Sequence, residues 1–385
     1  MREHWVHVGR GAAALGAAMG IGRFAYTPIL PLMTAQAGLT PAAAGHLATA
    51  NYVGYLAGAL AGAASSRLAR SVVAWRVSLV TLVASLAAMP LLASTIGWLA
   101  LRTVAGFASA VVFVIAVNWM LDHLGEHAPH LPGWGLGGVG IGIALSGALV
   151  LTLPVTAGWQ GAWWLASLSA GVLSVAAWVM CRISPPAAAV TAPVAPAAPP
   201  ARRRRFNPRF AVLFASYTLE GIGYIVAGTF LVAAIKQNSP GWLANGAWLF
   251  VGVAAAPSAA LWAWLGSRWS HRVLLVTALA LQAVGIAVPA LAGGTAAALV
   301  GAILFGGTFI GVSTIALAAG RALQISGAVA LLTAGYSAGQ IVGPMAVAPL
   351  LRDGFEHALL AAALVVVAAA VAAGLFRTPQ AAPGR

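Results

Sequence analysis

Two ionisable side chains stand out in this chain because long apolar stretches surround them on both sides. Glu220 is the only acidic residue deep inside such a stretch, and Arg23 lies in the middle of another. A charge in the middle of a membrane costs roughly 3 kcal/mol or more, so such residues face a cavity or a partner and are functional by default. A carboxyl group in that position can load and release a proton, and a guanidinium can bind an anion.

Two interpretations of this pair stay open at the level of sequence. In the first, Glu220 carries protons as it becomes exposed to alternate sides of the membrane, and Arg23 attracts an anionic solute group. In the second, the two residues form a permanent ion pair that never titrates. The first predicts that Glu220→Gln abolishes proton coupling but permits exchange, whereas the second predicts an unstable protein.

The composition shows what kind of chain must position these residues. Of its 385 residues, 61% are hydrophobic and only 7% are charged, and the mean hydropathy is +0.93. A soluble domain carries about 25% charged residues, so we expect an integral protein of the lipid bilayer. The apolar runs are continuous rather than alternating, which favours helices over a β-barrel. The single cysteine, Cys181, excludes an intrachain disulfide.

Runs of about 20 apolar residues predict twelve membrane-spanning helices. Residues 273–320, for example, hold no charged residue and are split only by Gly293-Gly294, which predicts two spans and a turn. Arg23 falls in the first span and Glu220 in the seventh. The predicted spans lie near residues 9–33, 43–64, 73–94, 97–121, 133–155, 161–181, 210–235, 243–265, 273–292, 295–319, 327–350 and 357–376.

The basic residues predict the orientation. With the N-terminus inside, sixteen of the 20 Lys and Arg residues fall on the cytoplasmic side, and only Lys236 and Arg352 fall outside. Cytoplasmic loops of membrane proteins carry this excess, so we expect both termini in the cytoplasm of a bacterial inner membrane. The same rule accounts for the net charge of +14 without a nucleic-acid partner.

The chain also divides into two related parts. A segment rich in Pro, Ala and Arg at 182–209 separates an N-terminal six-helix half, 1–181, from a C-terminal six-helix half, 210–385. A shift of 201 residues relates the halves, as expected for two-halved transporters. The shift places Gly20-Ile21-Gly22 on Gly221-Ile222-Gly223, Ser66-Arg67 on Ser267-Arg268, Gly106 on Gly307, and Gly138 and Gly142 on Gly339 and Gly343.

These motifs resemble those of the major facilitator superfamily. Span 1, Gly20-Ile-Gly-Arg-Phe-Ala-Tyr-Thr-Pro-Ile-Leu-Pro31, resembles the opening of the uncharacterised YbfB/YjiJ family, and Leu219-Glu-Gly-Ile-Gly-Tyr224 is similar to that family's second half. The resemblance implies an all-α integral membrane fold of twelve helices in two pseudo-symmetric halves. It also implies secondary active transport of a small organic solute by alternating access, performed by a single chain. The energy source would be the proton gradient, with no cofactor.

Several positions match the superfamily's gate and packing motifs. Ser66-Arg67 and Ser267-Arg268 resemble its Asp-Arg loop pair with serine in the acid position, so Arg67 and Arg268 are expected to meet helix C-termini at the cytoplasmic gate. Arg102-x-x-x-Gly106 resembles its fourth-span pattern, and the alternative for Arg102 is snorkelling to the outer interface. Gly138-x-x-x-Gly142 and Gly339-x-x-x-Gly343 would let helices approach closely and slide or rock.

Other polar residues in the spans are candidates for lining a solute site, and the alternative for each is a hydrogen bond between helices. The residues assigned to the solute, with Arg23, are Tyr26, Asn51, Asn118, Tyr224, Tyr336 and Gln340.

Other functional classes are less well supported. His123-x-x-Glu126-His127 matches an inverted zinc-peptidase motif, but Pro129 limits the helix and no third carboxylate ligand follows, so we expect neither a metal site nor an enzyme. The chain holds no nucleotide-binding Gly-x-x-x-x-Gly-Lys-Ser/Thr motif. Within transport, uniport and drug or metabolite efflux by antiport stay open. A membrane sensor or assembly partner on the same fold is the alternative of another class.

Overall fold

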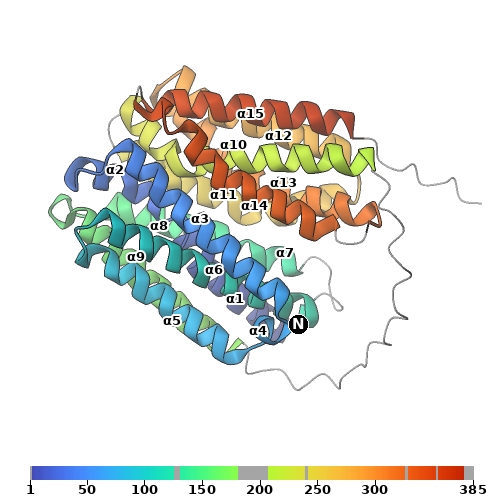
Figure 1. The fold of residues 1–385 in the computed structure, drawn as a ribbon, viewed down its shortest axis with the longest axis horizontal. Coiled ribbons are helices and arrows are strands. Elements are labelled where there is room, and N and C mark those ends of the chain that lie inside the picture. The colour runs from blue at the N-terminus through green and yellow to red at the C-terminus, as the bar shows by residue number, and fades with distance from the viewer. Residues whose placement is uncertain are drawn as a thin grey trace, which may run out of the picture.

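The computed structural model describes residues 2–124, 131–180, 207–238, 242–325, 328–352 and 354–376, and all regular structure in these ranges is helical (Figure 1). The first half contains α1 (Arg2–Leu15), α2 (Tyr26–Gln36), α3 (Pro41–Ala64), α4 (Ser66–Ala69), α5 (Val72–Ala88), α6 (Thr95–Leu124), α7 (Leu131–Leu136), α8 (Gly138–Thr152) and α9 (Gly158–Ala177). The second half contains α10 (Pro208–Asn238), α11 (Trp242–Gly266), α12 (His271–Leu291), α13 (Gly294–Ala322), α14 (Ala328–Val347) and α15 (Phe355–Leu375). Short 3-10 turns occur at Met89–Leu91, Val155–Ala157 and Leu350–Arg352.

The twelve predicted spans are all present as helical segments. Among the described residues, eight helices are long and apolar enough to cross a membrane by length and composition alone. The other four segments are α1 with α2, then α3, α9 and α14. α1 and α2 are separated by a break, and the other three helices carry many Gly, Trp, Tyr or amide residues that lower their hydropathy. Of the predicted linker at 182–209, residues up to 206 lie outside the described ranges, and α10 begins at Pro208.

Local residue chemistry explains where several spans begin. The Thr40 side chain accepts from the backbone N–H of Ala43 and is followed by Pro41, so α3 has a capped start. Ser71 and Ser270 cap α5 and α12 in the same way. Gly293 and Gly294 have φ values of 58° and 78°, which glycine adopts most easily, and they make the predicted turn between α12 and α13.

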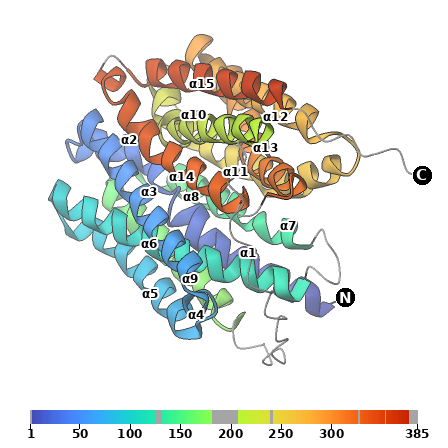
Figure 2. The same cartoon turned by 45° about the vertical axis from the view of Figure 1, so that its right-hand side comes forward.

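The helices form two groups that follow chain order. The blue-to-green half lies on one side and the yellow-to-red half on the other (Figures 1 and 2). The halves meet along α8 and α11, α3 and α14, and α2 and α10. The contact between α8 and α11 is close, since a Cβ atom added to Gly140 would lie 2.3 Å from the Ala256 nitrogen.

One end of the molecule is closed more tightly than the other. Every residue from Gly20 to Pro31, and every residue from Tyr224 to Ile235 on α10, is buried. A helix buried all round must have neighbours on every side, including the opposite half. At the start of α10, in contrast, Pro208, Arg209 and Ala215 are exposed. The halves are therefore closed around the C-terminal ends of α2 and α10, which we call the α2 end.

Candidate functional site

The first span is broken at Arg23. Gly16–Ile21 forms a π-helical turn, in which the Gly22 N–H donates to the Ala17 carbonyl at 2.8 Å. Helix resumes only at Tyr26, and Pro28 then removes the N–H that would have bonded to the carbonyl four residues earlier. Such wide turns occur frequently at functional sites. The break places Arg23 in irregular backbone at the centre of the bundle.

Arg102 on α6 satisfies the backbone that this break leaves open. Its guanidinium donates to the carbonyls of Gly22 at 3.2 Å and Arg23 at 3.0 Å, and the Ser109 hydroxyl donates to the carbonyl of Ala18 at 2.7 Å. Unpaired backbone groups inside a membrane cost several kcal/mol each, so irregular backbone needs partners of this kind. The side chain of Arg102 is 1% exposed. The alternative in which Arg102 snorkels to the outer interface therefore does not hold in this structure.

Arg23 points between the two halves and has no acidic partner among the described residues. It donates a hydrogen bond to the side-chain oxygen of Gln340 on α14, and its side chain is 3% exposed. Its Nε atom is buried and has no hydrogen-bond partner in the described part of the chain. The guanidinium carbon lies 4.5 Å from the ring centre of Tyr55, 4.9 Å from that of Tyr52 and 5.3 Å from that of Phe24. The groups that its guanidinium faces are neutral, and a second cation, Arg102, bonds to its backbone carbonyl.

Glu220 on α10 is also fully buried, but its neighbour is different. Its Oε1 atom accepts a hydrogen bond from Nε2 of Gln282 on α12 at 3.3 Å, and no described residue bonds to its Oε2 atom. Neither Arg23 nor any other described cation forms an ion pair with Glu220. The interpretation of Arg23 and Glu220 as a permanent ion pair is not what this conformation shows.

A set of parallel aromatic rings lies beside Arg23 in the second half. Tyr217 and Tyr336 have ring centres 4.4 Å apart, Tyr336 and Tyr224 5.4 Å, Tyr224 and Phe309 5.7 Å, and Phe309 and Phe305 5.5 Å. The planes of each consecutive pair differ by 8° to 17°. We call these five residues the ring stack. Phe24 contacts it through Phe309, with ring centres 6.2 Å apart, so the stack adjoins the residues around Arg23.

The structure brings together only part of the predicted solute set. Arg23, Tyr224, Tyr336 and Gln340 share one region at the meeting of the halves. The Tyr26 hydroxyl donates instead to the carbonyl of Ala44 at 3.0 Å, and its ring lies under Arg102.

The Asn51 and Asn118 side chains lie at other positions in the first half. The side-chain amide of Asn51 donates to the backbone carbonyl of Arg102 at 2.9 Å, which ties α3 to α6. Asn118 is half-buried and lies 16 residues after Arg102 on α6, which is about 24 Å along the helix axis.

Sequence reasoning missed several members of the site. Phe24, Tyr52, Phe305 and Phe309 looked like ordinary apolar or aromatic core residues. Two signals were available: the i,i+3 spacing of Tyr52 and Tyr55 and the i,i+4 spacing of Phe305 and Phe309 each place two rings on one helix face.

The predicted gate residues and the predicted packing glycines lie in different parts of the molecule. Arg67 and Arg268 are exposed at the end opposite the α2 end, and neither guanidinium donates a hydrogen bond to a described residue; Arg268 lies 4.0 Å over the Trp264 ring. Their predicted contact with helix C-termini is therefore absent from the described part of this conformation.

The paired glycines hold helices together within each half. A Cβ atom on Gly138 would lie 2.1 Å from the Ala12 carbonyl oxygen, and one on Gly142 2.3 Å from that of Gly16. Gly339 and Gly343 approach the α10 backbone in the same way. These four glycines thus pack span 5 on span 1 and span 11 on span 7. The contact between halves uses other positions, such as Gly140.

Two further places carry no part of this site. Most of the His123/Glu126/His127/His130 motif lies at 125–130, outside the described residues, and the His123 side chain is not described either.

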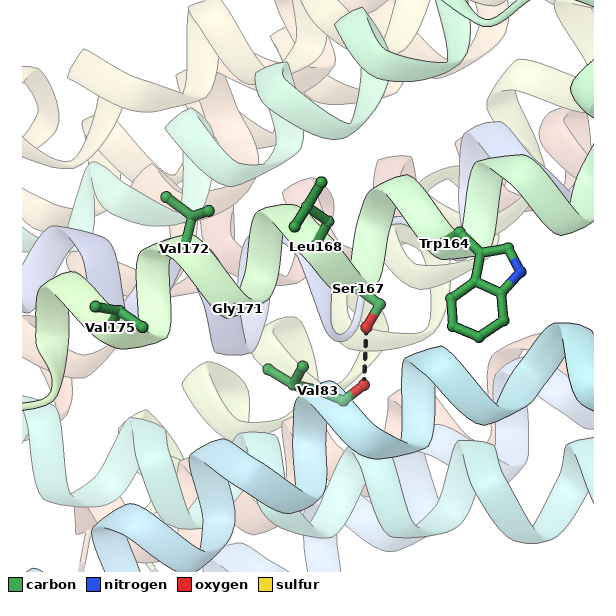
Figure 3. Close-up of a pocket in the computed structure, with 7 residues that line it drawn as sticks. All are labelled: Val83, Trp164, Ser167, Leu168, Gly171, Val172 and Val175. Atoms are coloured by element: carbon green, nitrogen blue, oxygen red, sulfur yellow. Dashed lines mark hydrogen bonds between the residues drawn. The ribbon is translucent and has the colours of Figure 1, made fainter.

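A shallow groove between α5 and α9 is apolar apart from a hydrogen bond from Ser167 to the Val83 carbonyl at 3.0 Å (Figure 3). Its rim residues Leu168, Val172 and Val175 are 62% to 74% exposed on the outer surface. It is lined by Val83, Trp164, Ser167, Leu168, Gly171, Val172 and Val175.

Comparison with known proteins agrees with the fold. Solved structures of the nucleoside transporter NupG and of a point mutant of it superpose with TM-scores of 0.70 and 0.71, at 13% and 12% sequence identity. The matches cover 96% and 95% of this chain and 98% of each of those chains. No curated protein sequence matched the chain. The family model described as uncharacterised MFS-type transporter YbfB matches residues 15–374. The chain therefore belongs to this transporter family of the major facilitator superfamily, as the sequence motifs predicted.

Proposed function

We propose that this chain is a proton-coupled secondary transporter that moves a small organic solute across a bacterial inner membrane by alternating access. Arg23 binds an anionic or strongly polar group of the solute, and Glu220 carries the coupling proton. The observation that carries this proposal is that Arg23 is buried where the halves meet, Glu220 is buried inside the second half, and no ion pair joins them.

The surroundings of the two groups support these roles. The Arg23 guanidinium faces a neutral amide and aromatic rings, and the nearby Arg102 adds a second positive charge. An incoming anion would supply the missing counter-charge. Glu220 has one neutral donor, Gln282, and a second oxygen without a partner. A carboxyl group there can hold a proton at low cost and can release it when rearrangement admits water.

The closed α2 end supports the assignment of this conformation to one state of the alternating-access cycle, the inward-facing state. The excess of basic residues at the opposite end predicts that this opposite end lies in the cytoplasm. The structure then corresponds to an inward-facing state, closed toward the outside. Reopening requires separating α2 from α10 and α3 from α14 at the α2 end.

Proton movement in everted membrane vesicles tests the proposal, with a pH-sensitive dye as the readout. Organic acids, amino acids, sugars, nucleosides and amphipathic drugs are added to vesicles with wild type, with Glu220→Gln or with no transporter. We expect one solute class to move protons only with wild type. Equal proton movement with Glu220→Gln would remove Glu220 as the proton site. Solute flux without proton movement would instead support uniport, and absence of any solute flux would support a sensor or assembly partner.

A further inference from the structure

We infer that the solute is a planar aromatic anion, whose carboxylate or similar group pairs with Arg23 and whose ring packs against the ring stack. This inference rests on the proposed function, because it names the solute class of the same site. It follows from two independent features: the unmet hydrogen-bonding capacity of Arg23 and the chemistry of the surfaces that surround it.

The first feature calls for an anion with two acceptor atoms. A guanidinium offers five N–H donors in a fixed plane, and the described residues supply only the Gln340 oxygen as an acceptor. The Nε atom is buried and unpartnered. A carboxylate can accept two parallel hydrogen bonds from Nε and a terminal nitrogen, which is the geometry preferred by such pairs. It would also neutralise the buried charge.

The second feature calls for a flat apolar body next to that anion. Phe24, Tyr52 and Tyr55 present rings to the guanidinium from the first half. From the second half, the ring stack reaches this place through the contact of Phe309 with Phe24. The rings of the stack already lie parallel, so an aromatic solute can continue this arrangement or replace one ring–ring contact. Offset-stacked ring pairs are favourable beyond the area that they bury.

The same surroundings disfavour other solute classes. A cationic solute would face the charge of Arg23. A small, strongly hydrated anion would lose its water to a ring-lined site without gaining contact for an apolar body.

Binding to the purified full-length protein tests the inference, measured by isothermal titration and by thermal stabilisation. The probes are benzoate, 4-hydroxybenzoate, 2-naphthoate and indole-3-acetate. Cyclohexanecarboxylate matches the charge without a planar ring, and benzamide and adenosine are planar without a charge. We expect at least one aromatic carboxylate to bind about tenfold or more tightly than all three controls. Binding by none of the four, or equal binding of cyclohexanecarboxylate, would overturn the inference.

Two pairs of variants test whether the aromatic carboxylate binds at Arg23 and Tyr224. Arg23→Gln should abolish binding of the aromatic carboxylate, whereas Arg23→Lys should retain part of it. Tyr224→Leu should weaken it about tenfold, whereas Tyr224→Phe, which keeps the ring, should bind as wild type does. Each variant is compared only after it elutes as a single folded species. Unchanged affinity in folded Arg23→Gln would contradict the inference.

The outcomes separate this inference from the proposed function. If another solute class drives proton movement in vesicles and no aromatic carboxylate binds, the proposed function stands and the inference is wrong. If an aromatic carboxylate binds through Arg23 but moves no protons, the inference stands and proton coupling is wrong.

Discussion

Thr27 and Gly228 lie 201 residues apart, and the Thr27 hydroxyl donates a hydrogen bond to the Gly228 carbonyl. The same shift relates the two halves of the sequence, so these are equivalent positions. Equivalent residues can touch only beside the axis that relates their halves. Arg23 and Tyr224 are equivalent by this shift as well. The candidate site therefore lies beside the pseudo-twofold axis, where one half contributes a cation and the other an aromatic ring.

The hydrogen bonds that join the halves near Arg23 should control how easily the α2 end opens. Thr27 bonds to Gly228, and the hydroxyls of Tyr52 and Thr229 lie 2.9 Å apart. Each bond contributes about 1 kcal/mol, so the double variant Thr27→Val/Tyr52→Phe should shift the equilibrium toward outward opening by an order of magnitude or more. Spin labels at Ala35 and Arg352, both exposed at this end, report the distance between halves.

The single cysteine makes this measurement simple, because Cys181→Ser removes the only competing thiol. Thr34→Val is the control, since the Thr34 hydroxyl bonds to the Pro31 carbonyl within its own helix and to no other described residue. The label distance should increase in the double variant and not in the control. An unchanged distance distribution in the double variant would mean that other contacts hold the α2 end closed.

Arg102 should be essential for the stability of the first span. Arg102→Leu removes two hydrogen bonds from a charged donor and leaves the carbonyls of Gly22 and Arg23 without their partner. Hydrogen bonds to charged groups contribute about 1.5–3 kcal/mol each, so we expect a loss of about 3 kcal/mol or more. Thermal unfolding of the detergent-purified protein measures this. Arg70→Gln, at an exposed arginine, is the control and should change stability by less than about 0.5 kcal/mol; equal stability of Arg102→Leu and wild type would contradict the assigned role.

Gly106 and Gly307 should differ despite their equivalence in sequence. A Cβ atom at Gly106 would lie 2.0 Å from the Asn51 carbonyl oxygen, whereas one at Gly307 would have no neighbour within 4 Å. Gly106→Ala must therefore push α3 away from α6, and we expect a markedly lower melting temperature. Gly307→Ala should be neutral or stabilising by up to about 1 kcal/mol, because alanine is the better helix former. Similar melting temperatures for the two variants would show that the α3–α6 contact tolerates the extra atom.

Much of the architecture could be predicted from sequence because membrane spans depend on composition and length. Twelve apolar segments, the turn at Gly293-Gly294 and the shift of 201 residues were all readable before any coordinates. The break in the first span could not be predicted from the sequence. The equivalent helix α10 shares the Gly-Ile-Gly motif but continues unbroken from Pro208 to Asn238. The difference follows from Pro28 and Pro31, which have no counterpart there.

The candidate site was less predictable because burial alone does not say which neighbour a polar side chain meets. Arg23 and Gln340 were both selected as polar residues, but their hydrogen bond joins positions 317 residues apart. For Arg102, the superfamily motif and a place at the membrane interface both stayed open, since a sequence does not reveal which carbonyls a broken helix leaves unpaired. Phe305 and Phe309 were missed because a stacked ring and an ordinary core ring have the same composition.

The central claim is that Glu220 couples solute movement to protons without being needed for folding. Its most direct test is uptake of labelled solute into proteoliposomes containing wild type or Glu220→Gln, with and without an imposed pH gradient. Glutamine keeps an oxygen acceptor for Gln282, so the variant should fold, insert and exchange solute as wild type does. We predict that it loses accumulation driven by the pH gradient while exchange continues. Accumulation at the wild-type level by Glu220→Gln would contradict the account.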